Sequence, residues 1–346
     1  MTPKPPAVLP GRPTIKMIAT LARVAPSTVS RAINDDPSIS LRTRARIQGI
    51  AARVGFVPNV TARGLVTRRS DVVALVLGPS QNPFYHEMIP HITERLALRS
   101  KPLMIVRMRE SDRIEATLAT LARHQVSGCL IGAASMTPEA FALCRRFDIP
   151  TVMVNRLANV EGSFVSCNNH EAGLQVASLF AAEGRRRIAY VGADPSKATF
   201  QDEQREAGLR DGAMDAGLTA PRRFATVYSY EGGLAAARAL LEQLPGADGI
   251  FVANDIVAFG VLDGLRRAGA VVPGQMSVVG FDDLPQACWL GYGLTTVRQP
   301  METIVEQALG ILDRQISEPG APAEGVYVSA ELVRRATTLG IPASAP

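Results

Sequence analysis

The sequence predicts two fold classes in one chain: an all-α head with a helix-turn-helix, and an α/β body with two doubly wound parallel-sheet lobes. Three observations lead to this prediction. Residues 14–65 carry short helical patterns of apolar residues, whereas residues 71–283 alternate apolar runs of strand length with helical patterns. In addition, positive charge is concentrated in the first 69 residues.

The head is predicted to contain three short helices. Thr14 is expected to cap the first helix, and Ser40 to cap the third, which Gly55 ends. The second helix is expected to begin at Pro26, because proline suits the first helical turn, where its missing N–H is not needed. Two helices joined by a short turn, the second with a polar outer face, are typical of a helix-turn-helix that reads the DNA major groove.

The charge distribution favours a nucleic-acid partner. The first 69 residues hold 12 basic and 2 acidic residues, a net charge of +10, while the remainder holds 25 basic and 30 acidic residues, a net charge of −5. Such an asymmetry is typical of a protein that binds a polyanion. The alternative is an ordinary solvated basic surface, and the coincidence with the helix-turn-helix pattern favours DNA.

The segments STVSRAIN (27–34), GFVPN (55–59) and ARGL (62–65) make the head resemble that of the LacI/GalR (lactose-repressor) family. The resemblance extends to about Thr338. It implies that base-reading positions are occupied by Pro26, Ser27 and Arg31. It also implies that phosphate-contacting positions are occupied by Thr28, Ser30 and Asn34.

Two residues of the head depart from the family pattern. Arg23 occupies a turn position where the family usually has glycine, and a left-handed backbone there strains a side chain by about 1 kcal/mol. Ala25 replaces the usual serine, so the second helix lacks a hydroxyl cap, a loss of roughly 1 kcal/mol. We therefore expect a head that is only marginally stable when it is not bound to DNA.

A hinge helix is predicted after Pro58. Asn59 is expected to cap a helix of about seven residues, which is too short to persist alone in water. In the resembled family, this helix pairs with its copy from a second subunit in the minor groove, where a leucine wedges between base pairs. Asn59, Ala62 and Leu65 occupy the corresponding positions. The alternative is a flexible linker that contains one leucine.

The body is predicted to bind its ligand at the carboxyl ends of parallel strands, as open α/β sheets do. One helix of the second sheet is expected over residues 203–216. The resemblance implies a periplasmic-binding-protein fold whose chain crosses between the lobes three times. The expected regions are a disordered arm (1–13), the head (14–58), the hinge and linker (59–70), an effector-binding and dimerisation body (71–340) and a tail (341–346). The N-lobe would comprise 71–165 and 299–327, and the C-lobe 166–297 and 328–340.

Polar and aromatic residues near the predicted strand ends and lobe crossings are the effector-binding candidates. They are Asn82, Phe84, Ser135, Asn155, Arg205, Asn254, Asp282 and Gln299. Amides, carboxylates and an aromatic ring suit a polyhydroxylated ligand, and the resemblance favours Arg205, Asn254 and Asp282 most. The alternatives are helix capping for Asn254 and Asp282, a core role for Phe84 and a surface charge for Arg205. Asp255 and Asp283 are expected to be structural.

Several functional classes find no support in the sequence. It contains no GxSxG elbow, P-loop, dinucleotide-binding GxGxxG or HExxH motif, and its four cysteines lack metal-binding spacing. We therefore predict no enzymatic activity, no cofactor and no metal. No apolar run has the length of a signal peptide or a membrane span, so we expect a cytoplasmic, nucleoid-associated protein.

The predicted function is sequence-specific DNA-binding transcriptional regulation, with repression favoured. A homodimer would bind an inverted-repeat operator on double-stranded DNA, and a small-molecule effector in the cleft, a sugar or sugar acid, would control it. The chain ends without heptads, which favours a dimer over a tetramer. Two alternatives stay open: a periplasmic-type solute-binding protein, which has no use for a basic head, and an effector-independent DNA-binding protein.

Overall fold

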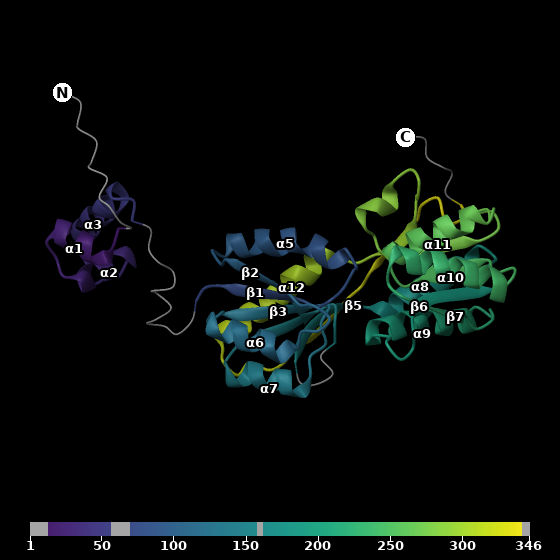
Figure 1. Ribbon diagram of the computed structural model, residues 1–346, viewed down its shortest axis with the longest axis horizontal. Coiled ribbons are helices and arrows are strands. Elements are labelled where there is room, and N and C mark those ends of the chain that lie inside the picture. Colours follow the sequence, from purple (N-terminus) through teal and green to yellow (C-terminus); the bar gives the residue numbers. More distant parts are fainter. Residues whose placement is uncertain (1–12, 57–69, 158–161, 341–346) are drawn as a thin grey trace, which may run out of the picture. The chain divides into compact units, whose positions relative to one another are not determined.

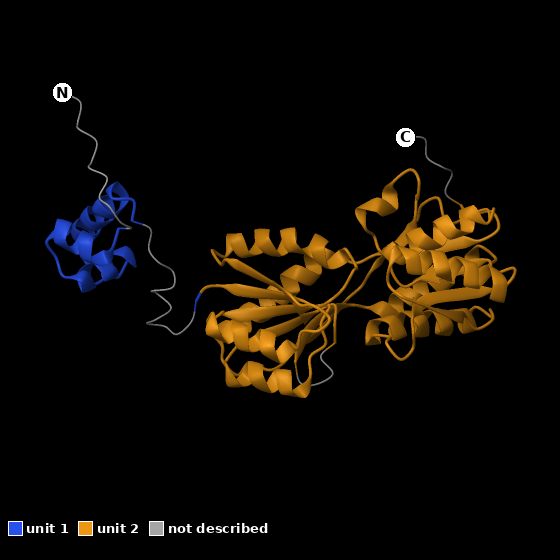
Figure 2. Cartoon of the chain, viewed as in Figure 1, with its two compact units in different colours: residues 1–70 blue, residues 71–346 orange. Residues whose placement is uncertain are grey.

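The computed structural model describes residues 13–56, 70–157 and 162–340, and the chain divides into two compact units, residues 1–70 and 71–346 (Figure 2). The predicted hinge helix, with Asn59, Ala62 and Leu65, lies outside the described residues. The same holds for the tail and for all of the predicted arm except Pro13.

The described part of the first unit is a three-helix head (Figure 1). Its helices are α1 (Ile15–Ala22), α2 (Pro26–Ile33) and α3 (Leu41–Arg53). The hydroxyls of Thr14 and Ser40 accept hydrogen bonds from backbone N–H groups in the first turns of α1 and α3, as the sequence predicts. Ile18, Val29 and Ile47, one from each helix, are fully buried in a shared core. The all-α head is therefore confirmed.

The second unit contains two six-stranded sheets. The sheet of the N-lobe has the order β11-β5-β4-β3-β1-β2, and all its pairs are parallel. Its strands are β1 (Val73–Leu77), β2 (Leu103–Arg107), β3 (Gly128–Gly132), β4 (Thr151–Val154), β5 (Ser163–Cys167) and β11 (Gly325–Val328).

The sheet of the C-lobe has the order β12-β10-β9-β8-β6-β7. Its strands are β6 (Ile188–Ala193), β7 (Arg222–Thr226), β8 (Gly249–Val252), β9 (Ser277–Asp282), β10 (Thr295–Arg298) and β12 (Glu331–Val333). All pairs are parallel except the edge strand β12, which is antiparallel to β10. The pattern did not predict this reversal, which arises because β12 enters the sheet directly from β11 of the other lobe without a crossover helix.

Helices cover both faces of each sheet (Figure 1). In the N-lobe they are α5 (Phe84–Leu98), α6 (Ile114–Arg123), α7 (Pro138–Arg146) and α12 (Met301–Ser317). In the C-lobe they are α8 (Asn169–Ala182), α9 (Phe200–Asp215), α10 (Tyr230–Gln243) and α11 (Asp255–Arg267), with a 3₁₀ helix at Pro285–Cys288.

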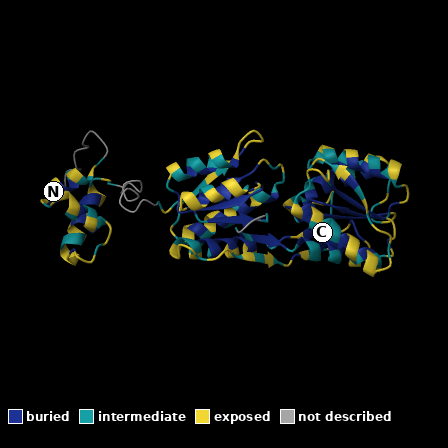
Figure 3. Cartoon of the chain, turned by 90° about the horizontal axis from the view of Figure 1, so that it is seen from below, coloured by how far each residue is buried: buried dark blue, intermediate teal, exposed yellow. Residues whose placement is uncertain are grey.

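Burial on both faces explains why the first strand reads as a continuous apolar run. Val73 and Leu75 share a core cluster with residues of α5 and α12, whereas Ala74 and Val76 belong to the cluster with α6 and α7. All five residues of β1 are buried, and Figure 3 shows buried residues concentrated in the strands of both lobes. A parallel strand with helices on each side cannot alternate apolar and polar residues, which confirms the α/β prediction for the body.

Three connections join the two sheets, after β5, β10 and β11. Because these connections lie close together, the carboxyl ends of strands from both sheets meet at one region between the lobes. No helix among the described residues is both long and apolar enough to cross a bilayer.

Candidate functional site

The outer surface of α2 carries the predicted DNA-contacting residues. Val29 and Ala32 face the core of the head and are fully buried. Pro26, Ser27, Arg31 and Asn34 are exposed, and Thr28 and Ser30 are partly exposed. The helix therefore presents a continuous polar surface that no other part of the described head covers.

The turn before α2 has the backbone that the sequence predicts. Arg23 lies in the left-handed region, with φ 51° and ψ 49°, and its N–H bonds to carbonyls of α1. Ala25 precedes α2 and provides no side-chain cap, so Pro26 in the first turn is the remaining helix-start signal. Both departures from the family pattern thus fall at the one turn that sets the angle between the two helices of the motif.

A pocket of about 270 Å³ lies between the lobes, near the ends of their strands. It is lined by seven of the eight predicted effector residues: Asn82, Phe84, Asn155, Arg205, Asn254, Asp282 and Gln299. Ser135 does not line this pocket, and its side chain is exposed. It follows β3, but the chain leaves the strand end at Ala133, where a left-handed backbone (φ 55°) turns it away.

Hydrogen bonds between side chains join the two lobes at this pocket. Asp282, which ends β9, accepts from Asn82 Nδ2 at 2.7 Å and from Gln299 Nε2 at 2.6 Å. Gln299 in turn accepts from Asn155 Nδ2 at 2.7 Å. Because Asn82 and Asn155 belong to the N-lobe and Asp282 to the C-lobe, this chain of hydrogen bonds links the lobes through one carboxyl group.

Asp282 is held in an unusual environment. It is 4% exposed, and its φ of 117° lies in the left-handed region. Burial raises the pKa of Asp282 to about 6, against the opposing effects of Arg205, Asn82 and Gln299. A carboxyl group with this pKa changes its charge near neutral pH, at the point where both lobes are bonded to it.

Arg205 is fixed against the C-lobe by three contacts. Its Nε donates to Asn169 Oδ1 at 2.8 Å, and its Nη1 donates to the carbonyl of Ala253. Its guanidinium carbon lies 3.5 Å from the centroid of the Phe281 ring, a stacked cation–π arrangement. These contacts set the plane of the guanidinium group, which argues against the surface-charge alternative.

Asn254 caps a helix and also lines the pocket. Its Oδ1 accepts from Val257 N at 3.0 Å and so caps α11. Its Nδ2 is buried and has no hydrogen-bond partner in the described structure. Phe84 is 1% exposed in the core of the N-lobe and also lines the pocket.

The two aspartates that were expected to be structural have internal partners. Asp255 is fully buried and accepts from Thr296 Oγ1 at 2.6 Å. Asp283 forms ion pairs with Arg298 and Arg335, each at 2.7 Å.

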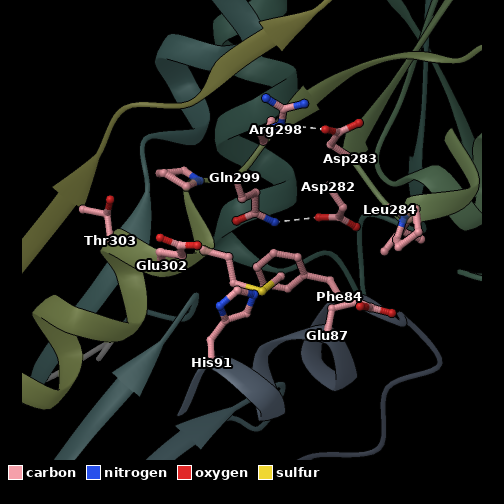
Figure 4. Close-up of a pocket in the computed structure, with 13 residues that line it drawn as sticks. Phe84, Glu87, His91, Asp282, Asp283, Leu284, Arg298, Gln299, Glu302 and Thr303 are labelled. Carbon is pink, nitrogen blue, oxygen red and sulfur yellow. Dashed lines mark hydrogen bonds and ion pairs between the residues drawn. The ribbon is translucent and has the colours of Figure 1, made fainter. Parts of the chain in front are cut away.

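A second pocket, of about 400 Å³, shares a wall with the first (Figure 4). Phe84, Asp282 and Gln299 line both pockets, and Figure 4 shows the hydrogen bond from Gln299 to Asp282 at this shared wall. Asp282 therefore contributes to the walls of both pockets.

Sequence reasoning missed the first turn of α9. The helix begins at Phe200 and not at residue 203, because the Thr199 hydroxyl accepts from Asp202 N at 3.4 Å. This start places Gln201 and Asp202 at the pocket. The signal was present as a Thr-x-x-Asp capping pattern at residues 199–202.

Asp202 is the centre of a buried polar cluster behind the pocket. Its Oδ1 accepts from Tyr190 Oη at 2.6 Å and from Tyr228 Oη at 2.5 Å, and its Oδ2 pairs with Arg223. Burial, followed by the nearby Asp202 charge, raises the pKa of both tyrosines well above the usual value, so both hydroxyls stay protonated donors.

Comparison with known proteins assigns the chain to a family. Residues 14–59 match the model of bacterial regulatory proteins of the lacI family, and residues 177–338 match that of a periplasmic binding protein-like domain. The HTH-type transcriptional regulator CelR of Thermobifida fusca is 31% identical over 334 residues, which cover 93% of this chain and 98% of CelR. The chain belongs to the LacI family.

Other LacI-family relatives match over the same length. The ribose operon repressor of Escherichia coli (strain K12) is 27% identical over 327 residues, covering 93% of this chain and 98% of that repressor. The solved structure of a CelR–cellobiose complex matches with a TM-score of 0.71 and 27% identity, covering 94% of this chain and all of that one. This LacI-family chain is thus a DNA-binding transcriptional regulator and not an enzyme, and the solute-binding alternative is set aside.

Proposed function

We propose that this LacI-family regulator represses transcription as a homodimer on an inverted-repeat operator, and that a sugar or sugar acid in the inter-lobe pocket controls its operator affinity. The observation that carries the proposal is the hydrogen-bond chain from Asn82 through Asp282 and Gln299 to Asn155, which joins the lobes at the pocket. A ligand that competes for these groups has different affinities for different lobe arrangements.

The choice of effector class rests on the pocket and on two relatives. Paired amides, a carboxylate, a stacked arginine and an aromatic ring suit a ligand with many hydroxyl groups. One relative was solved with cellobiose, and another is named for the ribose operon. The proposed contacts are those of the seven lining residues, and Ser135 is not among them.

The proposed DNA interface divides by role. Pro26, Ser27 and Arg31 read bases in the major groove, since they are exposed on the helix that Val29 and Ala32 anchor. Thr28, Ser30 and Asn34 contact phosphates. Asn59, Ala62 and Leu65 form a hinge that becomes ordered on operator DNA between the two subunits.

The proposed homodimer follows from symmetry, because a two-fold symmetric operator requires a two-fold symmetric protein. Effector binding changes the arrangement of the lobes and, through the N-lobe, the spacing of the two hinges. A coupling free energy of about 1–3 kcal/mol is typical for such a link, and either sign of control fits this mechanism. The regulator acts in the cytoplasm, on the chromosome.

Operator selection from random DNA tests the proposed function. The full chain is expected to enrich a two-fold symmetric site, with affinity that falls steeply as salt increases. Arg31→Ala is expected to weaken binding by about 1–3 kcal/mol and to relax base preference at one position of each half-site. Enrichment of no symmetric sequence would overturn the proposal, and a site whose affinity no metabolite changes would leave an effector-independent DNA-binding protein.

Leu65→Ser tests the hinge separately. The substitution is expected to weaken binding to the selected operator, because a polar side chain cannot wedge between base pairs, and to leave effector affinity unchanged. Equal operator affinity of the variant and the parent chain would contradict the hinge assignment.

A further inference from the structure

Three hydrogen-bond donors that line the inter-lobe pocket are buried without a partner. They are Gln201 Nε2, Asn254 Nδ2 and Arg156 Nε, none of which has an acceptor in the part of the chain that the structure describes. Gln201 is 7% exposed and Asn254 is 1% exposed. A buried donor without a partner is unfavourable by about 1–3 kcal/mol, so three at one pocket indicate a ligand that supplies acceptors.

Many of the acceptors of the same pocket are already engaged. Both oxygens of Asp282 accept from amides, and both oxygens of Asp202 accept from the tyrosine hydroxyls and Arg223. The side-chain amide oxygens of five further lining residues each accept a hydrogen bond from the protein: Asn82, Asn155, Asn169, Asn254 and Gln299. The pocket therefore offers three buried donors without partners, whereas both of its buried carboxylates and five of its amide oxygens are already bonded within the protein.

The charged residues that line the pocket also favour a ligand that accepts hydrogen bonds. Arg156, Lys197 and Arg205 line it, and none of them forms an ion pair within 4.0 Å among the described residues. The carboxylate of Asp202 is instead neutralised by Arg223 behind the pocket wall. The unpaired carboxylates are Asp282 and the exposed Glu110.

The helices of the C-lobe add to the positive potential. Asn169 and Gln201 lie in the first turns of α8 and α9, and Asn254 is the N-cap of α11; all three residues line the pocket. The aligned peptide dipoles of a helix favour negative charge at its N-terminus, and three such termini converge here.

We propose that the effector is a polyhydroxylated compound with an anionic oxygen group, a carboxylate or a phosphate, which accepts hydrogen bonds from Arg156, Gln201 and Asn254. The inference rests on the proposed function and narrows its ligand class. A neutral hydroxyl group brings a proton that needs an acceptor, and the pocket has few to offer. An anionic oxygen group only accepts, so it satisfies all three donors and leaves no proton unpaired.

Matched pairs of compounds test the proposal on the full-length chain. Each pair keeps the hydroxyl configuration and changes only the charged group: D-gluconate against D-glucitol, D-glucuronate against D-glucose, and D-glucose 6-phosphate against D-glucose, with the corresponding galactose and mannose series. Isothermal titration calorimetry at constant ionic strength gives the affinities. At least one anionic compound is expected to bind tenfold or more tightly than its neutral partner, and the carboxylate and phosphate pairs distinguish the two sources of charge.

The substitution Gln201→Glu tests whether Gln201 donates a hydrogen bond to the anionic group. The substitution keeps the shape of the side chain but replaces the free donor with an acceptor, and a carboxylate in the first turn of α9 suits the helix dipole, so the fold is expected to persist. We expect the preference for the anionic partner to fall tenfold or more. Gln204→Glu makes the same change in the same helix at a residue that does not line this pocket, and it is expected to keep the preference.

Arg156→Gln provides a second variant that does not depend on α9. It is expected to reduce the affinity for the anionic compound and to leave the affinity for the neutral partner within twofold. The proposal is overturned if the neutral compounds bind as tightly as the anionic ones. It is also overturned if the preference survives both substitutions, or if no anionic compound of the panel binds.

Operator binding in the same samples separates this inference from the proposed function. A neutral sugar that changes operator affinity would overturn the inference and leave the proposed function intact. A chain that binds no symmetric operator with or without any compound would overturn the proposed function itself.

Discussion

At the scale of the residue, two buried carboxyl groups, those of Asp282 and Asp202, lie at the pocket between the lobes. Asp282 of the C-lobe is buried, is bonded to Asn82 of the N-lobe, and has a pKa of about 6, whereas Asp202 is buried and surrounded by donors. The two carboxyl groups lie near the same pocket, yet their partners differ. Asp282 of the C-lobe is bonded by the neutral amides of Asn82 in the N-lobe and of Gln299 at a crossing between the lobes. Asp202 is bonded by a guanidinium and two hydroxyls of its own lobe. We therefore expect the hydrogen bonds of Asp282 to change when the lobes rearrange. We expect those of Asp202 to stabilise the C-lobe in any arrangement.

The titration of Asp282 predicts a pH dependence of stability. Its pKa is raised from 3.8 to about 6 in the folded chain, so the folded state binds more protons than the unfolded state between these values. The contribution of Asp282 to the free energy of unfolding is therefore fully present below about pH 4, and it is lost as the pH rises through about 6. Relative to Asp282→Asn, the parent chain should lose up to about 3 kcal/mol of unfolding free energy between pH 4 and pH 7.

Urea unfolding of both chains across this range measures the difference. Asp215→Asn, at an exposed position of α9, is the control and should follow the parent chain at every pH. A constant difference between the parent chain and Asp282→Asn would contradict the assigned titration.

Removal of the Asp202 carboxylate should destabilise the C-lobe strongly. Asp202→Ala leaves Arg223 and the hydroxyls of Tyr190 and Tyr228 without their shared acceptor. A buried pair that loses one partner typically destabilises a protein by about 3–5 kcal/mol. Tyr228→Phe removes a single donor and should reduce the unfolding free energy by only about 1 kcal/mol. Chemical denaturation measures the unfolding free energy of both variants. Similar decreases for Asp202→Ala and Tyr228→Phe would show that the cluster does not act as a unit.

At the scale of the element, the turn between α1 and α2 combines two unfavourable local features. Arg23 has a left-handed backbone, and α2 begins without a side-chain cap. Both features reduce the stability of the helix that faces DNA, while Ile18, Val29 and Ile47 still bury the core. The sequence predicts both features of this turn correctly, because the left-handed backbone at Arg23 and the missing cap at Ala25 each depend on the residue type at one position.

Ala25→Ser should strengthen the start of α2. A serine hydroxyl at this position can accept a hydrogen bond from an N–H group in the first turn, which stabilises a helix by about 1 kcal/mol. We expect amide hydrogen exchange across α1–α3 in the full-length chain to slow by about fivefold. Thr14→Ala removes the existing cap of α1 and should change exchange in the opposite direction by a similar factor. Unchanged exchange in Ala25→Ser would contradict the cap argument.

The element scale also shows where sequence reasoning fails. The helix α9 begins at Phe200, three residues before the predicted start and directly after the capping residue Thr199. The sequence analysis does not identify Gln201, a pocket donor without a partner, which lies in this extra turn. Ser135 was included because it follows β3 closely, but the left-handed residue Ala133 directs the chain away from the pocket. Position after a strand is therefore not a sufficient signal, and Arg205 in α9 shows that it is not a necessary one.

At the scale of the whole molecule, the sequence predicted the two sheets because strands buried on both faces read as continuous apolar runs. It did not predict that β12 runs antiparallel to β10, since a three-residue edge strand carries almost no pattern. The three crossings came from family resemblance, because sheet membership depends on pairing between residues far apart in sequence. The sequence likewise does not predict the hydrogen bond between Asn82 and Asp282 that links the lobes, since these residues are 200 positions apart.

At the same scale, the pocket and the operator are proposed to be coupled through the two lobes. The most direct measurement is the affinity of the full-length chain for its bound compound with and without saturating operator DNA, together with operator affinity with and without that compound. Because coupling is reciprocal, both comparisons are expected to give the same factor, between about 5 and 150, and Asp282→Asn should bring both close to one. A parent chain in which neither ligand affects the other, or an Asp282→Asn chain that keeps the factor of the parent chain, would contradict the account.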